Sequence, residues 1–107
     1  MRQERAIGHV SQVPLGEGRN FKVDGEIVTV FRTRAQEVFA TQPRCPHKGG
    51  PLSDGLLGGA TLVCPLHDIA FDLRTGESLT GHCRLRTYPV RTTEDGRLIL
   101  ESVDATG

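Results

Sequence analysis

The sequence is poor in aromatic side chains: tryptophan is missing, and one tyrosine and four phenylalanines make up 5% of the 107 residues. The hydrophobic core must therefore be built mainly from valine, leucine and isoleucine. A chain of this length forms one domain with core enough to fold but little to spare. We therefore expect a single domain that spans residues 1–107.

Long apolar runs and blocks of like charge are also missing. No stretch has the length of a membrane-spanning helix, and the charged start (residues 1–5) leads into no signal-peptide core. Thirteen basic and thirteen acidic residues cancel, which argues against nucleic acid binding. No P-loop or dinucleotide fingerprint occurs, so we expect no NAD(P)H site. These absences predict a soluble, cytoplasmic protein with neither membrane nor nucleic acid as partner.

Cysteine is scarce as well, with three in the chain. An odd number argues against a disulfide framework and fits a cytoplasmic location. Two of the three, Cys45 and Cys64, fall in short motifs that also contain histidine. Cys83 is left over, and we expect it to be a small buried or half-buried core residue rather than a nucleophile.

The two motifs are Cys45-Pro46-His47 and Cys64-Pro65-Leu66-His67, with sixteen residues between them. Each supplies one thiolate and one imidazole, which are ligands for soft and borderline metals. A structural zinc finger usually opens with two cysteines and closes with two histidines, so the order here does not suit it. Mononuclear zinc nevertheless remains the alternative. If each motif gave its cysteine to one of two bridged irons and its histidine to the other, the result would be the ligand set of a Rieske [2Fe–2S] centre.

The residues around the motifs support the iron–sulfur interpretation. The stretch from Cys45 to Gly55, the second motif, Phe71-Asp72-Leu73 and Thr75-Gly76-Glu77 resemble the Rieske family, and the resemblance extends from about Ile27 to Leu100. It implies one [2Fe–2S] cluster held by two cysteines and two histidines: Cys45, His47, Cys64 and His67. It also implies an antiparallel β-sandwich with a cluster-binding subdomain inserted at about residues 43–71.

The pattern of the chain agrees with an all-β fold. Residues 26–32 form the best strand and are apolar on both faces, which predicts a central position. Asp24-Gly25 before it is a strong hairpin signal. Persuasive helical periodicity is missing. We expect further strands at residues 9–13, 21–23, 38–41, 60–63 and 70–73, a closing hairpin of 85–90 with 97–100, and a frayed end from Ser102.

Within the Rieske family, the high-potential members carry an extra disulfide and two hydroxyl groups near the cluster. The resemblance places Gly50 and Leu66 at the disulfide positions, and Ile69 and Phe71 at those of the serine and tyrosine. Both features are therefore missing here. Asp68 beside His67 would also disfavour an added electron. These departures predict a low-potential electron-transfer protein.

The resemblance implies protein redox partners, a reductase that supplies the electron and a terminal oxidoreductase that accepts it, and it leaves two such systems open. The run Cys45 to Gly55 resembles the small subunit of NAD(P)H-dependent assimilatory nitrite reductase, which we favour. The alternative is the ferredoxin of an aromatic-ring-hydroxylating dioxygenase. A non-redox module of the same fold is a third hypothesis, which four intact ligands disfavour.

Other candidate residues have simpler interpretations. We expect His9 and His82 to be surface residues, and Arg44 and Lys48 to belong to a solvated face that could meet an acidic partner. The loop from Ser78 to His82 lacks the proline that many members of the family carry beside the cluster. The sequence alone leaves this part of the docking surface open.

Overall fold

The computed structural model describes residues 2–46, 50–64, 69–79 and 83–103, and these residues form strands joined by turns. Two 3₁₀ turns, η1 (Val10–Gln12) and η2 (Leu52–Asp54), are the helical elements of these ranges. The strands are β1 (Arg2–His9), β2 (Glu17–Val23), β3 (Glu26–Arg32), β4 (Val38–Thr41), β5 (Leu56–Gly58), β6 (Thr61–Val63), β7 (Ala70–Asp72), β8 (Thr87–Tyr88), β9 (Val90–Thr92) and β10 (Arg97–Val103). The predicted all-β class is confirmed.

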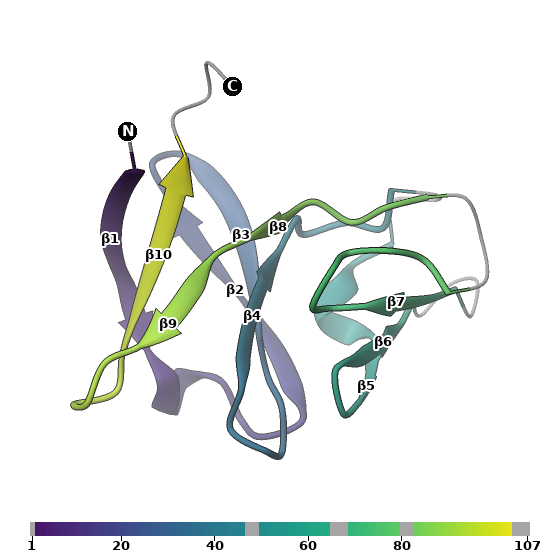
Figure 1. Cartoon of the computed structure of the whole chain (residues 1–107), viewed down its shortest axis with the longest axis horizontal. Helices are drawn as coiled ribbons and strands as arrows, with labels where there is room; N and C mark the ends of the chain where they lie inside the picture. The colour runs from purple at the N-terminus through teal and green to yellow at the C-terminus, as the bar shows by residue number, and fades with distance from the viewer. Residues whose placement is uncertain (1, 47–49, 65–68, 80–82, 104–107) are drawn as a thin grey trace.

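Two antiparallel sheets pack face to face as a sandwich (Figure 1). One has the strand order β1-β10-β9 and the other β2-β3-β4-β8. Alternate residues of the strands point into the space between the sheets, where burial of each valine or leucine contributes about 1.5–3 kcal/mol. This sandwich core consists of Val13, Phe21, Val28, Val30, Ala40, Leu98 and Leu100.

A third antiparallel sheet, β5-β6-β7, lies beside the sandwich (Figure 1). It belongs to a second apolar core, here called the cysteine core: Phe31, Cys45, Leu52, Leu62, Cys64, Phe71, Leu73 and Leu85. Both cysteines of the sequence motifs are members of this core. The protein therefore has two packed centres, one for the sandwich and one for the part of the chain that carries the motifs.

Strand β3 connects the two cores because both of its faces are buried, as its sequence predicts. Val28 and Val30 point into the sandwich core, whereas Phe31 points the other way into the cysteine core. β3 lies between β2 and β4 in its sheet, so its predicted central position is confirmed. The predicted turn before it is also present, since Asp24 and Gly25 have φ values of 51° and 84°, as a two-residue hairpin loop requires.

Some predicted strands differ from the structure. His9 ends β1, and residues 10–12 form η1, so a strand over 9–13 is wrong. The mostly polar N-terminal segment forms β1 (Arg2–His9) instead, because it pairs with β10 over its length. Ser102 and Val103 pair with Gln3 and Arg2, so these two residues are not frayed. Strand β5 was not predicted, because glycines surround its two leucines in the sequence.

The closing hairpin is only partly as predicted. β9 pairs with β10 around the turn at residues 94–96, but β8 pairs with β4 in the other sheet. Pro89 separates β8 from β9 and has no N–H to give to a ladder, which suits a place where the chain leaves one sheet for the other. Leu85, which the prediction placed in the hairpin, lies in the cysteine core.

Within the described ranges, no helix has the length and apolar character to cross a bilayer.

Candidate metal centre

The two motifs begin two loops of matching construction. The N–H of Cys45 donates to the carbonyl of Gly50, and the N–H of Cys64 donates to that of Ile69, both at 2.8 Å. Just outside these bonds, Arg44 pairs antiparallel with Pro51, and the last residue of β6 pairs with the first of β7. In each motif, the backbone N–H of the cysteine thus bonds to the carbonyl of the residue five positions later, next to an antiparallel pair.

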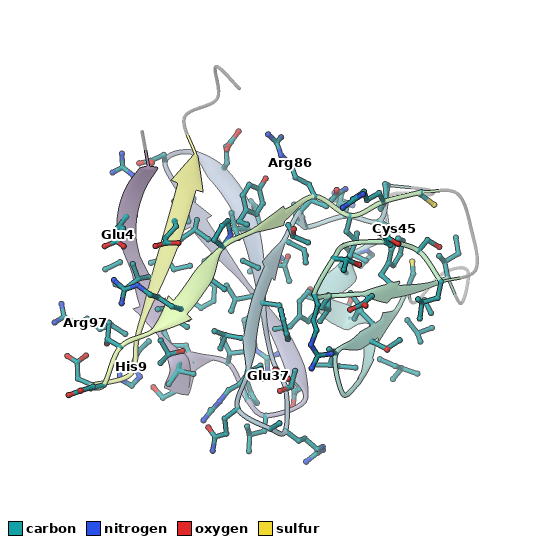
Figure 2. The ribbon with its side chains drawn as sticks, in the orientation of Figure 1. Glu4, His9, Glu37, Cys45, Arg86 and Arg97 are labelled. Atoms are coloured by element: carbon teal, nitrogen blue, oxygen red, sulfur yellow. The ribbon has the colours of Figure 1, made fainter. Side chains whose placement is uncertain are left out.

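Both cysteines lie inside the protein. Cys45 is 2% exposed and Cys64 is fully buried, and both belong to the cysteine core. All three cysteines of the chain are among the described residues, and none forms a disulfide. Cys45 lies at the end of the molecule that holds the small sheet, away from the β1-β10-β9 sheet (Figure 2).

The predicted histidine ligands His47 and His67 lie outside the described residues, as do Lys48, Leu66, Asp68 and His82. Within the described ranges no group of three or more histidine, cysteine or acidic side chains is placed to bind a metal. The structure therefore brings two of the four predicted ligands into one core and leaves the other two untested.

Side chains from distant strands enclose the cysteines. Phe31 comes from β3 and Phe71 from β7, and both are almost completely buried in the same core. The ring of Phe31 lies over Gly18 of β2, where an added Cβ would come within 2.6 Å of it. Such an apolar shell excludes water from the thiol groups and lowers the local dielectric constant.

A third segment completes this end of the protein. Phe71 forms an isolated antiparallel bridge to Ser78, and Glu77 forms one to Arg84, so the chain around Ser78 lies beside β7 and the chain around Arg84 lies beside Glu77. Cys83 is half-buried and packs against the cysteine core, as expected for a filling residue. The sequence did not predict that Phe31 and Leu85 enter the cysteine core, or that Gly18 leaves room for the ring of Phe31. The apolar residues on both faces of β3 were a signal for the burial of Phe31. No pattern in the sequence indicated the roles of Gly18 and Leu85.

His9 lies at the other end of the molecule from Cys45 (Figure 2). Its Nδ1 accepts from the N–H of Ser11 at 3.1 Å, and its Nε2 lies 2.8 Å from the carbonyl of Asp95. His9 therefore caps η1 and joins it to the β9–β10 turn, which is a more specific structural role than the predicted surface position. In the same turn, the pKa of Asp95 is lowered, mainly by a hydrogen bond from the hydroxyl of Thr93 and to a smaller extent by the charge of Arg97.

The three antiparallel sheets define this chain as a small all-β domain. Its two cysteine motifs meet in one buried core, which forms the candidate metal centre. Comparison with protein families agrees, since residues 3–91 match the Rieske [2Fe–2S] domain. The chain belongs to this family of electron-transfer domains, whose name implies a [2Fe–2S] cluster.

Known proteins of two systems are similar to it. The ferredoxin component of the naphthalene 1,2-dioxygenase/salicylate 5-hydroxylase systems of a Ralstonia species is 33% identical over 94 residues, which are 86% of this chain and 88% of that protein.

Among solved structures, a protein assigned as the small subunit of an NADH-dependent nitrite reductase from Mycobacterium tuberculosis has a TM-score of 0.87 at 24% identity, covering 96% of this chain and 97% of its own. The ferredoxin in a complex with the oxygenase of carbazole 1,9a-dioxygenase has a TM-score of 0.74 at 26% identity, and the match covers 89% of this chain and 99% of that ferredoxin.

Proposed function

We propose that this protein carries single electrons on one [2Fe–2S] cluster held by Cys45, His47, Cys64 and His67. The observation that carries the proposal is the matched pair of loops, each closed by the N–H of its cysteine. Both predicted histidines fall within these loops in the sequence. The cluster-binding part of the domain would then span about residues 43–71.

The described residues suit such a cluster. The donor set combines two thiolates with two imidazoles, which is the Rieske ligand set and unlike the usual order of a zinc finger. The two thiols are buried in one apolar core, and neither forms a disulfide. When bound, the cluster would take up one electron and give it back.

The chain's own residues would tune the potential of that cluster. Phe71 supplies no hydroxyl in the buried core, and Gly50 cannot form the additional disulfide of the high-potential members. Hydrogen bonds to the cluster sulfurs favour the more negative reduced state, so their loss lowers the potential. The midpoint should therefore lie toward the bottom of the Rieske range of about −150 to +300 mV.

For the electron acceptor, we propose first a terminal oxygenase. Similarity to the Ralstonia dioxygenase ferredoxin covers most of both chains at 33% identity. A ferredoxin of similar fold is known in complex with an oxygenase. The acceptor would take the electron from the reduced cluster, and a reductase would supply it.

The second candidate acceptor is a nitrite reductase, which the sequence motif from Cys45 to Gly55 favours. The likeness to the nitrite reductase small subunit, at 24% identity, concerns the fold. The two candidates differ in their acceptors. Single-turnover mixing of the reduced protein with purified oxygenase or with purified sirohaem nitrite reductase should therefore show fast oxidation by only one of them.

The cofactor itself is tested by iron and sulfide analysis of protein purified anaerobically. We expect two irons and two acid-labile sulfides per chain. Cys45→Ala and Cys64→Ala should each abolish or badly weaken the cluster, because each removes a ligand. Cys83→Ala is the matched control, since it removes a half-buried thiol beside the same core and should keep the cluster. Stoichiometric zinc without labile sulfide would overturn the proposal.

A further inference from the structure

An exposed apolar row crosses the small sheet next to the second cysteine loop. Leu56 of β5 pairs with Val63 of β6, which pairs with Ala70 of β7. The N–H of Leu79 donates to the carbonyl of Ala70 at 2.8 Å and so continues the row on the far side. Residues paired across antiparallel strands point to the same face of a sheet, so these four side chains share one face.

This face of the sheet points away from the cysteine core. The next paired row, Leu62 with Phe71, is fully buried and lies on the opposite face. Leu56 is 75% exposed and Leu79 is 59% exposed, which makes them the two most exposed large apolar residues among those that the structure describes. Two such side chains in one row differ from the scattered exposed apolar residues that are normal on protein surfaces.

The position of the row suggests its use. Val63 is followed directly by Cys64, and Val63 and Ala70 form the last pair below the loop that Cys64 begins. A protein that covers this row therefore lies against the base of that loop. Electron transfer needs such closeness, because the rate falls steeply with the distance between donor and acceptor.

We propose that the row of Leu56, Val63, Ala70 and Leu79 is the docking surface for the terminal oxygenase that accepts the electron. This inference rests on the proposed function. In the complex, the reduced cluster would lose one electron and the acceptor's metal centre would gain it, with no bond made or broken. The partner should present an apolar patch of similar size, because the row itself carries no charged side chain.

A second copy of the chain is the less suitable occupant. A stable homodimer usually buries 2,000 Å² or more, which a row of four small or medium-sized side chains does not provide. Short-lived redox complexes lie at the low end of interface size, below about 1,200 Å². A small apolar row therefore fits a partner that binds, takes the electron and leaves.

The test uses the full-length chain with its cluster loaded and an oxygenase purified from the same cells, chosen because it oxidises the dithionite-reduced protein. Stopped-flow mixing gives the second-order rate constant for this oxidation. The double variant Leu56→Thr/Leu79→Thr should lower the constant at least tenfold, with cluster content and midpoint potential unchanged. The loss should persist at high salt, because burial of apolar surface is not screened by ions.

Ile27→Thr is the matched control. Ile27 is also an exposed apolar strand residue, with 41% of its surface accessible to solvent. It lies in β3 of the sandwich rather than in the small sheet. This variant should transfer electrons at the unaltered rate. Equal losses in the control and the double variant, or no loss in either, would overturn the docking surface.

Two further measurements separate the possible failures. If the wild-type protein holds no iron–sulfur cluster, the proposed function itself fails. If the cluster is present and the double variant transfers normally, only the docking surface fails. Sedimentation at the assay concentration tests the other occupant: a wild-type dimer that the double variant dissociates would assign the row to self-association and overturn the oxygenase proposal.

Discussion

Phe71 shows how one side chain can set a property of the proposed cluster. It is fully buried in the cysteine core with Cys45 and Cys64, on the strand that follows the second loop. The resemblance to the Rieske family places a tyrosine hydroxyl at this position in high-potential members. The missing oxygen is therefore a single-atom difference at a place where the structure shows close packing.

We expect Phe71→Tyr to raise the midpoint potential. A hydroxyl that donates to a cluster sulfur stabilises the reduced state by about 1 kcal/mol, which corresponds to roughly 40 mV for one electron. Protein-film voltammetry measures the shift. Phe21→Tyr is a control, because Phe21 belongs to the sandwich core. An unchanged midpoint in a cluster-loaded Phe71→Tyr protein would show that the hydroxyl does not reach a sulfur.

Among the elements, the turn after β7 brings two stretches of backbone unusually close. Gly76 has a φ of +83°, and a Cβ added there would lie 2.4 Å from the carbonyl oxygen of Leu85. The N–H of Leu85 donates to the carbonyl of Gly76 at 2.7 Å. The turn therefore fastens the segment of Leu85 to the small sheet, and a side chain at residue 76 would force them apart.

Gly76→Ala should destabilise the protein by more than Gly25→Ala. Gly25 has nearly the same φ, +84°, but nothing lies within 4 Å of its added Cβ. Gly25→Ala therefore costs only the positive-φ strain, about 1 kcal/mol, whereas Gly76→Ala adds a backbone clash and should cost roughly 2–4 kcal/mol in total. Urea unfolding measures both. Equal costs would mean that the segment of Leu85 moves aside without loss.

At the scale of the whole molecule, the protein has two cores that share strand β3. The proposed ligands Cys45 and Cys64 belong to one core, and the β1-β10 pairing closes the other. Metal binding adds to folding free energy where the ligands are. Loss of the cluster should therefore affect the two halves of the protein unequally.

Removal of iron with an anaerobic chelator should expose the cysteine core first. We expect amides of β6 and β7 to exchange hydrogen at least tenfold faster, while those of β2, β3 and β10 keep most of their protection. Hydrogen exchange followed by mass spectrometry of peptides measures this difference. Uniform loss of protection would show that the two cores unfold as one unit.

Local patterns determined much of this protein before any folding was considered. Runs of β-branched and apolar residues predicted β3 and β4 with their observed ends, and Asp24-Gly25 predicted the turn before β3, because these features depend on neighbouring residues. The cysteine and histidine spacing likewise pointed to the Rieske family, which the comparison confirmed.

Tertiary structure decided what depends on residues far apart in the sequence. β1 is a strand because β10 pairs with it, and β8 separates from β9 because its partner β4 belongs to the other sheet. The burial of Cys45 beside Phe31 and Leu85 likewise requires three distant segments to pack together. The exposed row beside Cys64 needs the registers of three hairpins, because no local pattern states which strands will pair or which face will remain open to solvent.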